Sequence, residues 1–214
     1  MFELIKNHLH VAIKEYSEGL LYNTLLMAKN EYFALTGIVH EESDEYEPRM
    51  NSFNDWFLFH YSPQKNGITV IQEYLAKNDL SEDIILAFAS LNYSLMEFKK
   101  TNLKKQTVLK DILHDKNIII NETSVGLVEK DLFIGRIITY KEKNYLLKGI
   151  CILPADTKTA CSKEAKKIRK LKSTQDEYYF LLGVESLKTK WIHYGRHIEA
   201  KKIFIFNNSV SPTA

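Results

Sequence analysis

The stretch Asp131-Leu-Phe-Ile-Gly-Arg-Ile-Ile-Thr-Tyr140 decides the fold of this chain, because β-branched and aromatic residues dominate it and favour an extended strand. Similar runs lie on either side of it, separated by turn-like segments, and they begin at Tyr93, Thr107, Lys116 and Asn144. The last run predicts a single strand over residues 144–153. Five short strands within about 60 residues predict a small, strongly bent barrel of the SH3-like or OB-like kind over residues 91–153.

The residues before the predicted barrel show the spacing of helices, with apolar positions three and four apart. Residues 2–36 predict one long helix or two shorter helices with a break at Gly19, and further helices are expected near residues 53–61, 68–78 and 81–90. Residues 40–52 hold five acids and one proline, which predicts a loop or linker, with Ser52 capping the helix that follows. We therefore expect an acidic helical region over residues 1–90.

The residues after the barrel predict a second helical region, over residues 154–208. One helix is expected to start at Pro154 and continue to about residue 172, and another to open with the capping box Thr174-Gln-Asp-Glu177. Residues 202–206 predict a late strand, and residues 209–214 a disordered tail. The predicted fold class is α+β.

Charge is distributed unevenly along the chain, although its formal net charge is only +2. Residues 1–98 carry six basic and 15 acidic side chains, whereas residues 99–214 carry 23 basic and 12 acidic ones. Two interpretations stay open at this point. Either the basic half faces a partner, or the two halves attract one another within the fold.

The clearest candidate site is a basic stripe in the helix predicted after Pro154. Lysines follow one another at helical spacings of three and four and so share one face, with further cations beside them. Such a stripe suits the phosphates of a nucleic acid, an anionic membrane surface or an acidic protein partner, and the alternative is an ordinary solvated helix face. The candidate binding residues are Lys163, Lys166, Lys167, Arg169, Lys170 and Lys172.

The sequence contains no recognisable catalytic motif, so we predict no catalytic residues, no cofactor and no metal site. The two cysteines can build neither a disulfide framework nor a four-ligand zinc site. Cys151 lies in an apolar run and is expected to be buried and inert, whereas Cys161 is expected to be more exposed, with a pKa lowered by nearby lysines. Without a predicted signal peptide or membrane-spanning segment, the expected location is the cytoplasm.

Three further segments carry a resemblance to known proteins: Phe53-Asn-Asp-Trp-Phe-Leu-Phe-His-Tyr61, Tyr93-Ser-Leu-Met-Glu-Phe98 and Asp131-Leu-Phe-Ile-Gly-Arg-Ile137. Residues 53–153 resemble an uncharacterised bacterial arrangement, in which a helical WF-rich segment leads into a small β unit, sometimes alongside a SEC-C zinc motif. The clustered cysteines of that motif are absent here. The resemblance implies a bacterial, adaptor-like or accessory protein. We accordingly predict a non-enzymatic regulatory protein that acts through protein–protein contacts, with nucleic-acid binding as the alternative.

Overall fold

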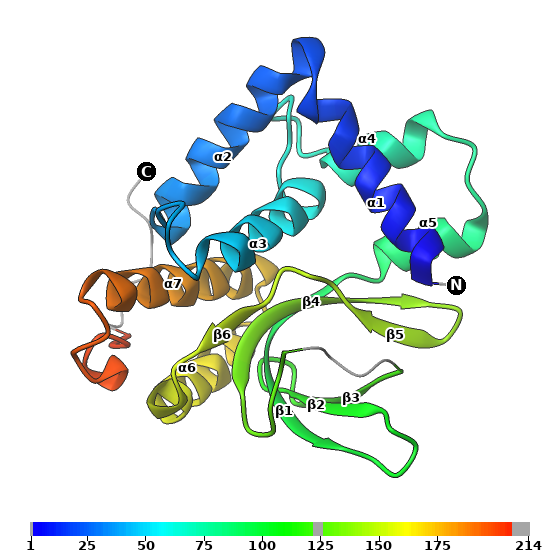
Figure 1. Ribbon diagram of the computed structural model, residues 1–214. Coiled ribbons are helices and arrows are strands. Elements are labelled where there is room, and N and C mark those ends of the chain that lie inside the picture. Colours follow the sequence, from blue (N-terminus) through cyan, green and yellow to red (C-terminus); the bar gives the residue numbers. More distant parts are fainter. Residues whose placement is uncertain (1, 122–125, 207–214) are drawn as a thin grey trace.

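The computed structural model describes residues 2–121 and 126–206, and it places helices around one end of a small β-barrel (Figure 1). This arrangement confirms the predicted α+β class. In chain order the elements are α1 (Phe2–Ser17), η1 (Gly19–Leu21), α2 (Tyr22–Thr36), α3 (Tyr46–Phe59), α4 (Val70–Lys77), α5 (Glu82–Ala89), β1 (Asn92–Thr101), β2 (Thr107–Asp111), β3 (Lys116–Ile120), β4 (Leu132–Tyr140), β5 (Lys143–Leu146), β6 (Cys151–Leu153), η2 (Ala155–Thr157), α6 (Lys158–Leu171), α7 (Thr174–His193) and η3 (Ala200–Lys202).

The barrel closes because β1 pairs with strands on both of its edges. Within the described ranges the sheet runs β1-β2-β3-β5-β4-β6, and an additional β1–β4 pairing closes the first five strands into a ring, so that Met96 lies opposite both Asp111 and Phe133. All pairs are antiparallel except β3–β5, where Ile120 pairs with Asn144. Strand β6 continues the sheet beyond β4, outside the closed ring. The small bent barrel predicted from the sequence is therefore present.

The strand predicted over residues 144–153 is instead two strands, and Gly149 lies in the gap between them. The Gly149 N–H donates to Asp55 Oδ2 of α3 at 2.8 Å. A Cβ atom at Gly149 would lie only 2.8 Å from the Ser52 Cα atom. The strand is interrupted at Gly149 because the backbone of the barrel and the backbone of α3 are in direct contact there.

The N-terminal helices form a layer around α3, whose buried aromatic residues Phe53, Trp56, Phe57 and Phe59 belong to the core there. The break at Gly19, with φ of +67°, separates α1 and α2 as the sequence suggests. The prediction of a loop over residues 40–52 is wrong from Tyr46 onward, since α3 begins there and Ser52 is buried within it rather than capping it. The acidic side chains at the start of α3 stabilise the helix because they interact favourably with the positive end of its dipole. Pro48 lies in the first turn, where proline is tolerated.

The C-terminal helices α6 and α7 pack against β1, β4 and β6 of the barrel, and α7 also lies beside α2 (Figure 1). Ser173 rather than Thr174 caps α7, its hydroxyl accepting from the Asp176 N–H at 3.2 Å. The late strand predicted over residues 202–206 is wrong, because Phe204 is buried among helical and barrel side chains and the chain turns to place it there. The predicted disordered tail, residues 209–214, lies outside the described residues.

A buried polar cluster joins the helices to the barrel. Glu185 of α7 pairs with Arg49 of α3 at 3.4 Å, and its carboxylate accepts from the hydroxyls of Tyr32 and Tyr93 at 2.6 and 3.0 Å. The buried Arg136 guanidinium of β4 stacks on the Tyr93 ring, 3.9 Å from its centroid. These contacts connect α2, α3, α7, β1 and β4, so the helical and barrel parts pack as one unit.

Candidate functional site

The predicted basic helix exists as α6, and its periodicity sets which side faces solvent. Cys161 and Ala165 are fully buried one turn apart, so the residues about half a turn from them point outward. Lys163, Lys166 and Lys170 occupy that outer face and are exposed. The structure therefore confirms neither a nucleic acid nor an acidic protein as the partner. It does place the lysine stripe in solvent.

Ion pairs engage only part of the predicted site. Lys167 pairs with Glu164 of the same helix at 2.8 Å, and the half-buried Arg169 pairs with Asp115 at 3.2 Å. The other four predicted residues have no ion-pair partner in the part of the chain that the structure describes, and all four are exposed: Lys163, Lys166, Lys170 and Lys172. We call these four side chains the basic surface.

The acidic N-terminal half does not cover the basic surface. Among the described residues, the ion pair between α6 and residues 1–98 is that of Lys158 with Glu97, at 2.8 Å, and it lies at the first turn of the helix. Lys172 ends α6 in the left-handed conformation, and basic side chains in the last turn also favour the helix dipole. Attraction between the two halves thus neutralises Lys158 but leaves the basic surface free.

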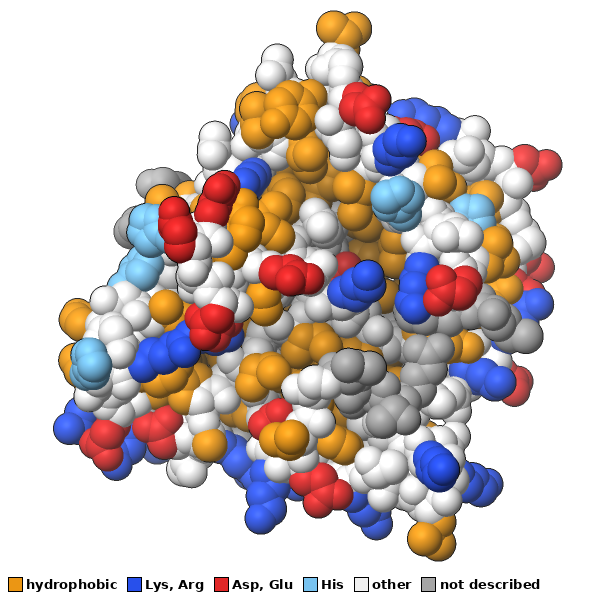
Figure 2. All heavy atoms as spheres, in the orientation of Figure 1, with side chains coloured by type: hydrophobic (Ala, Val, Ile, Leu, Met, Phe, Trp, Pro, Cys, Tyr) orange, Lys and Arg blue, Asp and Glu red, His pale blue; other side chains and the backbone are white. Residues whose placement is uncertain are grey.

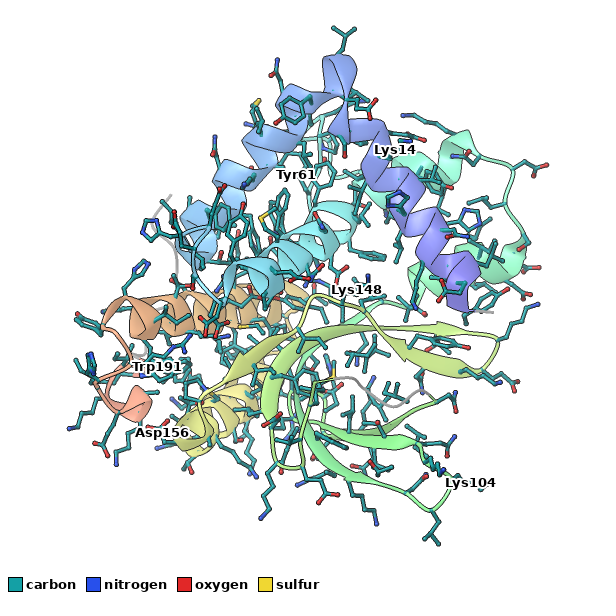
Figure 3. The ribbon with its side chains drawn as sticks, in the orientation of Figure 1. Lys14, Tyr61, Lys104, Lys148, Asp156 and Trp191 are labelled. Atoms are coloured by element: carbon teal, nitrogen blue, oxygen red, sulfur yellow. The ribbon has the colours of Figure 1, made fainter. Side chains whose placement is uncertain are left out.

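Two carboxylates outside the basic surface link α6 to the barrel through ion pairs. Glu97 of β1 contacts both Lys158 and Lys99, and Asp115 in the β2–β3 turn contacts both Arg169 and Lys110. In Figure 2, Lys and Arg side chains gather along the lower edge of the molecule, beneath α6 and the barrel. Figure 3 marks Asp156 at the start of this edge and Lys104 at the tip of the β1–β2 hairpin.

Neither cysteine is available for nucleophilic chemistry on the surface. Both are free and buried, and burial raises the pKa of Cys151 to about 11 and that of Cys161 to about 12. The expectation of an exposed Cys161 with a lowered pKa is therefore wrong. The cysteine occupies the inner face of α6, so the lysines that neighbour it in sequence point away from it.

A serine, an aspartate and a histidine meet at the β2–β3 turn, which the sequence did not indicate. Asp111 accepts from the Ser94 hydroxyl at 2.5 Å and from the backbone N–H of His114 at 3.0 Å. Its other oxygen lies 2.9 Å from His114 Nδ1, and this bond raises the pKa of His114. Because Ser94 is fully buried and donates to the carboxylate rather than to the imidazole, the group fixes the turn and does not form a nucleophile–base pair.

Two open hollows mark the surface away from α6. One, of about 460 Å³, lies beside α2, and the other, of about 430 Å³, is lined by polar and aliphatic residues of β1, β3, β4 and β5. Across residues 2–121 and 126–206, no three His, Cys, Asp or Glu side chains are grouped so that they could hold a metal ion.

The comparison with protein families gives a match over most of the chain. Residues 12–180 match DUF7986, a family of unknown function. The chain belongs to this family. The matched DUF7986 region contains the barrel, α3 and the basic helix, and it ends within α7. Neither curated proteins nor solved structures yield a match.

The helices of this DUF7986 member are compatible with the expected lack of a membrane span. None of those in the described ranges combines the length and the apolar character that crossing a bilayer requires.

Proposed function

We propose that the protein is an adaptor-like binding protein that holds the backbone of a nucleic acid on its basic surface. The observation that carries the proposal is that Lys163, Lys166, Lys170 and Lys172 project into solvent without an ion-pair partner among the described residues. Adjacent lysines on the outer face of α6 are separated by about 4.5–6 Å along the helix axis. This spacing suits a partner with closely spaced negative charges, such as phosphates.

The composition of this face favours nucleic acid over a protein partner. Its other exposed positions include Thr159, Lys167 and Leu171, and Leu171, which is 59% exposed in the last turn, is the one large apolar side chain exposed on α6. Protein–protein interfaces have an apolar or aromatic centre and are depleted in lysine, whereas nucleic-acid interfaces are polar and strongly positive. Because lysines outnumber this single leucine, the exposed side chains of α6 match phosphate contact better than docking of an acidic protein.

The barrel supports the same proposal by analogy of fold. Closed five-stranded barrels of the OB-like kind bind oligonucleotides through one face and the adjoining loops. Here the β1–β2 hairpin presents Leu103, Lys104 and Lys105 to solvent. The aromatic residues of the described barrel strands are buried or half-buried, so base stacking is not offered. We expect binding that depends on charge and tolerates any sequence.

We also propose that the protein acts in the bacterial cytoplasm as a regulatory protein. Its cysteines are free and buried, as is usual in a reducing compartment. The link to SEC-C proteins stays a prediction, to be tested by the domain composition of other family members.

Titration of labelled poly-U RNA and of duplex DNA, followed by fluorescence anisotropy between ~50 and ~200 mM salt, tests the proposal. Four phosphate contacts predict a slope of log affinity against log salt of about −3.6 for duplex DNA and about −2.8 for a single strand. The variant Lys163→Glu/Lys166→Glu/Lys170→Glu should bind at least about tenfold more weakly and flatten the slope to about −1.

A matched control variant reverses the charge of three exposed lysines of the N-terminal helical layer, each replaced by glutamate, and should retain nucleic-acid binding. These lysines are Lys14, Lys65 and Lys77. The proposal fails if binding is absent, indifferent to salt, or equally weakened in both variants. Displacement of RNA by polyglutamate at the same charge concentration would assign the surface to an acidic protein instead.

A further inference from the structure

The outer face of α2 is apolar, although the helix already contributes to the core. Ala28, Tyr32 and Thr36 are buried on its inner side. On the other side Leu26 and Met27 are 40% and 61% exposed. The exposed Glu31 lies at the edge of this side, one turn after Met27. The uncharged residues of this side are called the α2 face: Tyr22, Asn23, Leu26, Met27, Asn30 and Ala34. Figure 2 shows apolar side chains along the edge of the molecule that α2 forms in Figure 1.

The hollow of about 460 Å³ lies at the C-terminal end of the α2 face. Phe33, Ala34, Ile38 and Val39 form its apolar lining, and Ile38 is 61% exposed. Lys29 Nζ donates to Tyr46 Oη at 3.3 Å and lies within 6 Å of the Phe33 ring, so this cation is held against the wall. A hollow of this size accepts one or two large side chains.

An acidic segment forms part of the border of the hollow, and from it Glu41 lines the hollow itself, together with Lys29 of α2. The segment of residues 40–47 contains five acids and no lysine or arginine. Asp44 pairs with Arg196, and Glu45 pairs with Lys188 and Arg196. The remaining three acids, Glu41, Glu42 and Glu47, are exposed and have no ion-pair partner among the described residues. An occupant with positive charges at this border is therefore favoured.

From these observations we infer that the α2 face and its hollow dock an amphipathic α-helix of a protein partner, with large apolar residues on one stripe and lysine or arginine beside it. Helices bind in this way by placing residues at i, i+4 and i+7 along an apolar groove. The 15 residues of α2 extend about 22 Å, enough to align with a partner helix of four turns. This inference concerns the adaptor part of the proposed function and is independent of nucleic-acid binding, because the two surfaces share no element.

Photo-crosslinking from Met27 in the intact chain, expressed in cells of its own source, tests the inference. The probe is p-benzoylphenylalanine in place of Met27, and the matched control carries it in place of Leu103, a fully exposed apolar residue at the β1–β2 hairpin. We expect a discrete adduct from position 27 that is absent from position 103. Mass spectrometry should locate the crosslink in a basic amphipathic segment of another protein.

The variant Glu41→Lys/Glu42→Lys/Glu47→Lys, added to the probe at position 27, separates specific docking from unspecific apolar contact. Loss of three border charges should lower the adduct yield about tenfold. Charge reversal at Lys163, Lys166 and Lys170 should leave the adduct yield unchanged. The result is therefore independent of whether the basic surface binds nucleic acid. The inference is overturned by the lack of an adduct above the control, by an adduct with a second copy or a lipid, or by an attached segment without the basic amphipathic pattern.

Discussion

Replacement of Gly149 by alanine should destabilise the protein strongly, because this glycine is where the barrel touches α3. An added Cβ would meet Asp55 Oδ2, and it would lie 2.8 Å from the Ser52 Cα atom and 2.9 Å from the Asn51 carbonyl oxygen. Two of these atoms belong to the helix backbone, so no side-chain rotation relieves the overlap. Either α3 or the β5–β6 segment has to move.

The cost has two parts. Overpacking at a rigid contact typically costs about 1–3 kcal/mol. The same displacement lengthens the 2.8 Å bond from the Gly149 N–H to Asp55, and an unsatisfied buried group costs about 1–3 kcal/mol. Since one movement causes both losses, we expect a decrease of about 2–4 kcal/mol in the free energy of unfolding. For a chain of this length that lowers Tm by roughly 4–16 °C.

Urea unfolding followed by tryptophan fluorescence measures the effect, with Gly183→Ala as the matched control. Gly183 lies within α7, and an added Cβ there meets no atom within 4 Å. That alanine should stabilise the protein by about 0.5–1 kcal/mol, because glycine weakens a helix interior. If Gly149→Ala unfolds within about 0.5 kcal/mol of the natural chain, the close approach of barrel and helix is not as described.

Three other perturbations test the buried groups. Burial raises the pKa of Asp55 from 3.8 to about 6, so the folded state binds its proton more tightly than the unfolded state and this carboxylate costs stability above pH 6. The difference in unfolding free energy between Asp55→Asn and the natural chain should therefore shift by roughly 2 kcal/mol in favour of the natural chain as the pH falls from 7 to 4, and a constant difference across urea titrations would contradict this. Arg49→Met leaves Glu185 buried without its cation and should lower the free energy of unfolding by about 3–5 kcal/mol, whereas adding Glu185→Met should cost less than the two single changes together. Neither Cys151 nor Cys161 should react with Ellman's reagent near neutral pH until denaturant is added, and prompt release of one equivalent from the native chain would show that a thiol is accessible.

The α2 face shows what the sequence contained but did not reveal by itself. Leu25, Ala28 and Tyr32 form the inner stripe that indicates a helix, and Leu26 and Met27 add apolar side chains on the other side. A helix that is apolar on two sides signals either deep burial or a second contact. Only the arrangement of α1 and α3 shows that the outer side stays exposed.

The sequence by itself determined the elements that local preference controls. Runs of β-branched residues such as those of β4 specify strands, Gly19 interrupts the first helix, and spacings of three and four put Lys163, Lys166 and Lys170 on one side of α6. These features depend on residues within a few positions of one another, so a single chain segment contains the information.

Tertiary structure decided the features that depend on residues far apart in the chain. Cys161 is buried because the lysine side of α6 faces away from the core, and Phe204 leaves the predicted strand because the helices provide a site for it. The gap between β5 and β6 exists because Gly149 meets a helix about 95 positions earlier in the chain, and Glu185 is stabilised by groups brought together from separate helices and strands. Burial and pairing of this kind arise only when the elements pack, because no short segment carries both partners of the contact.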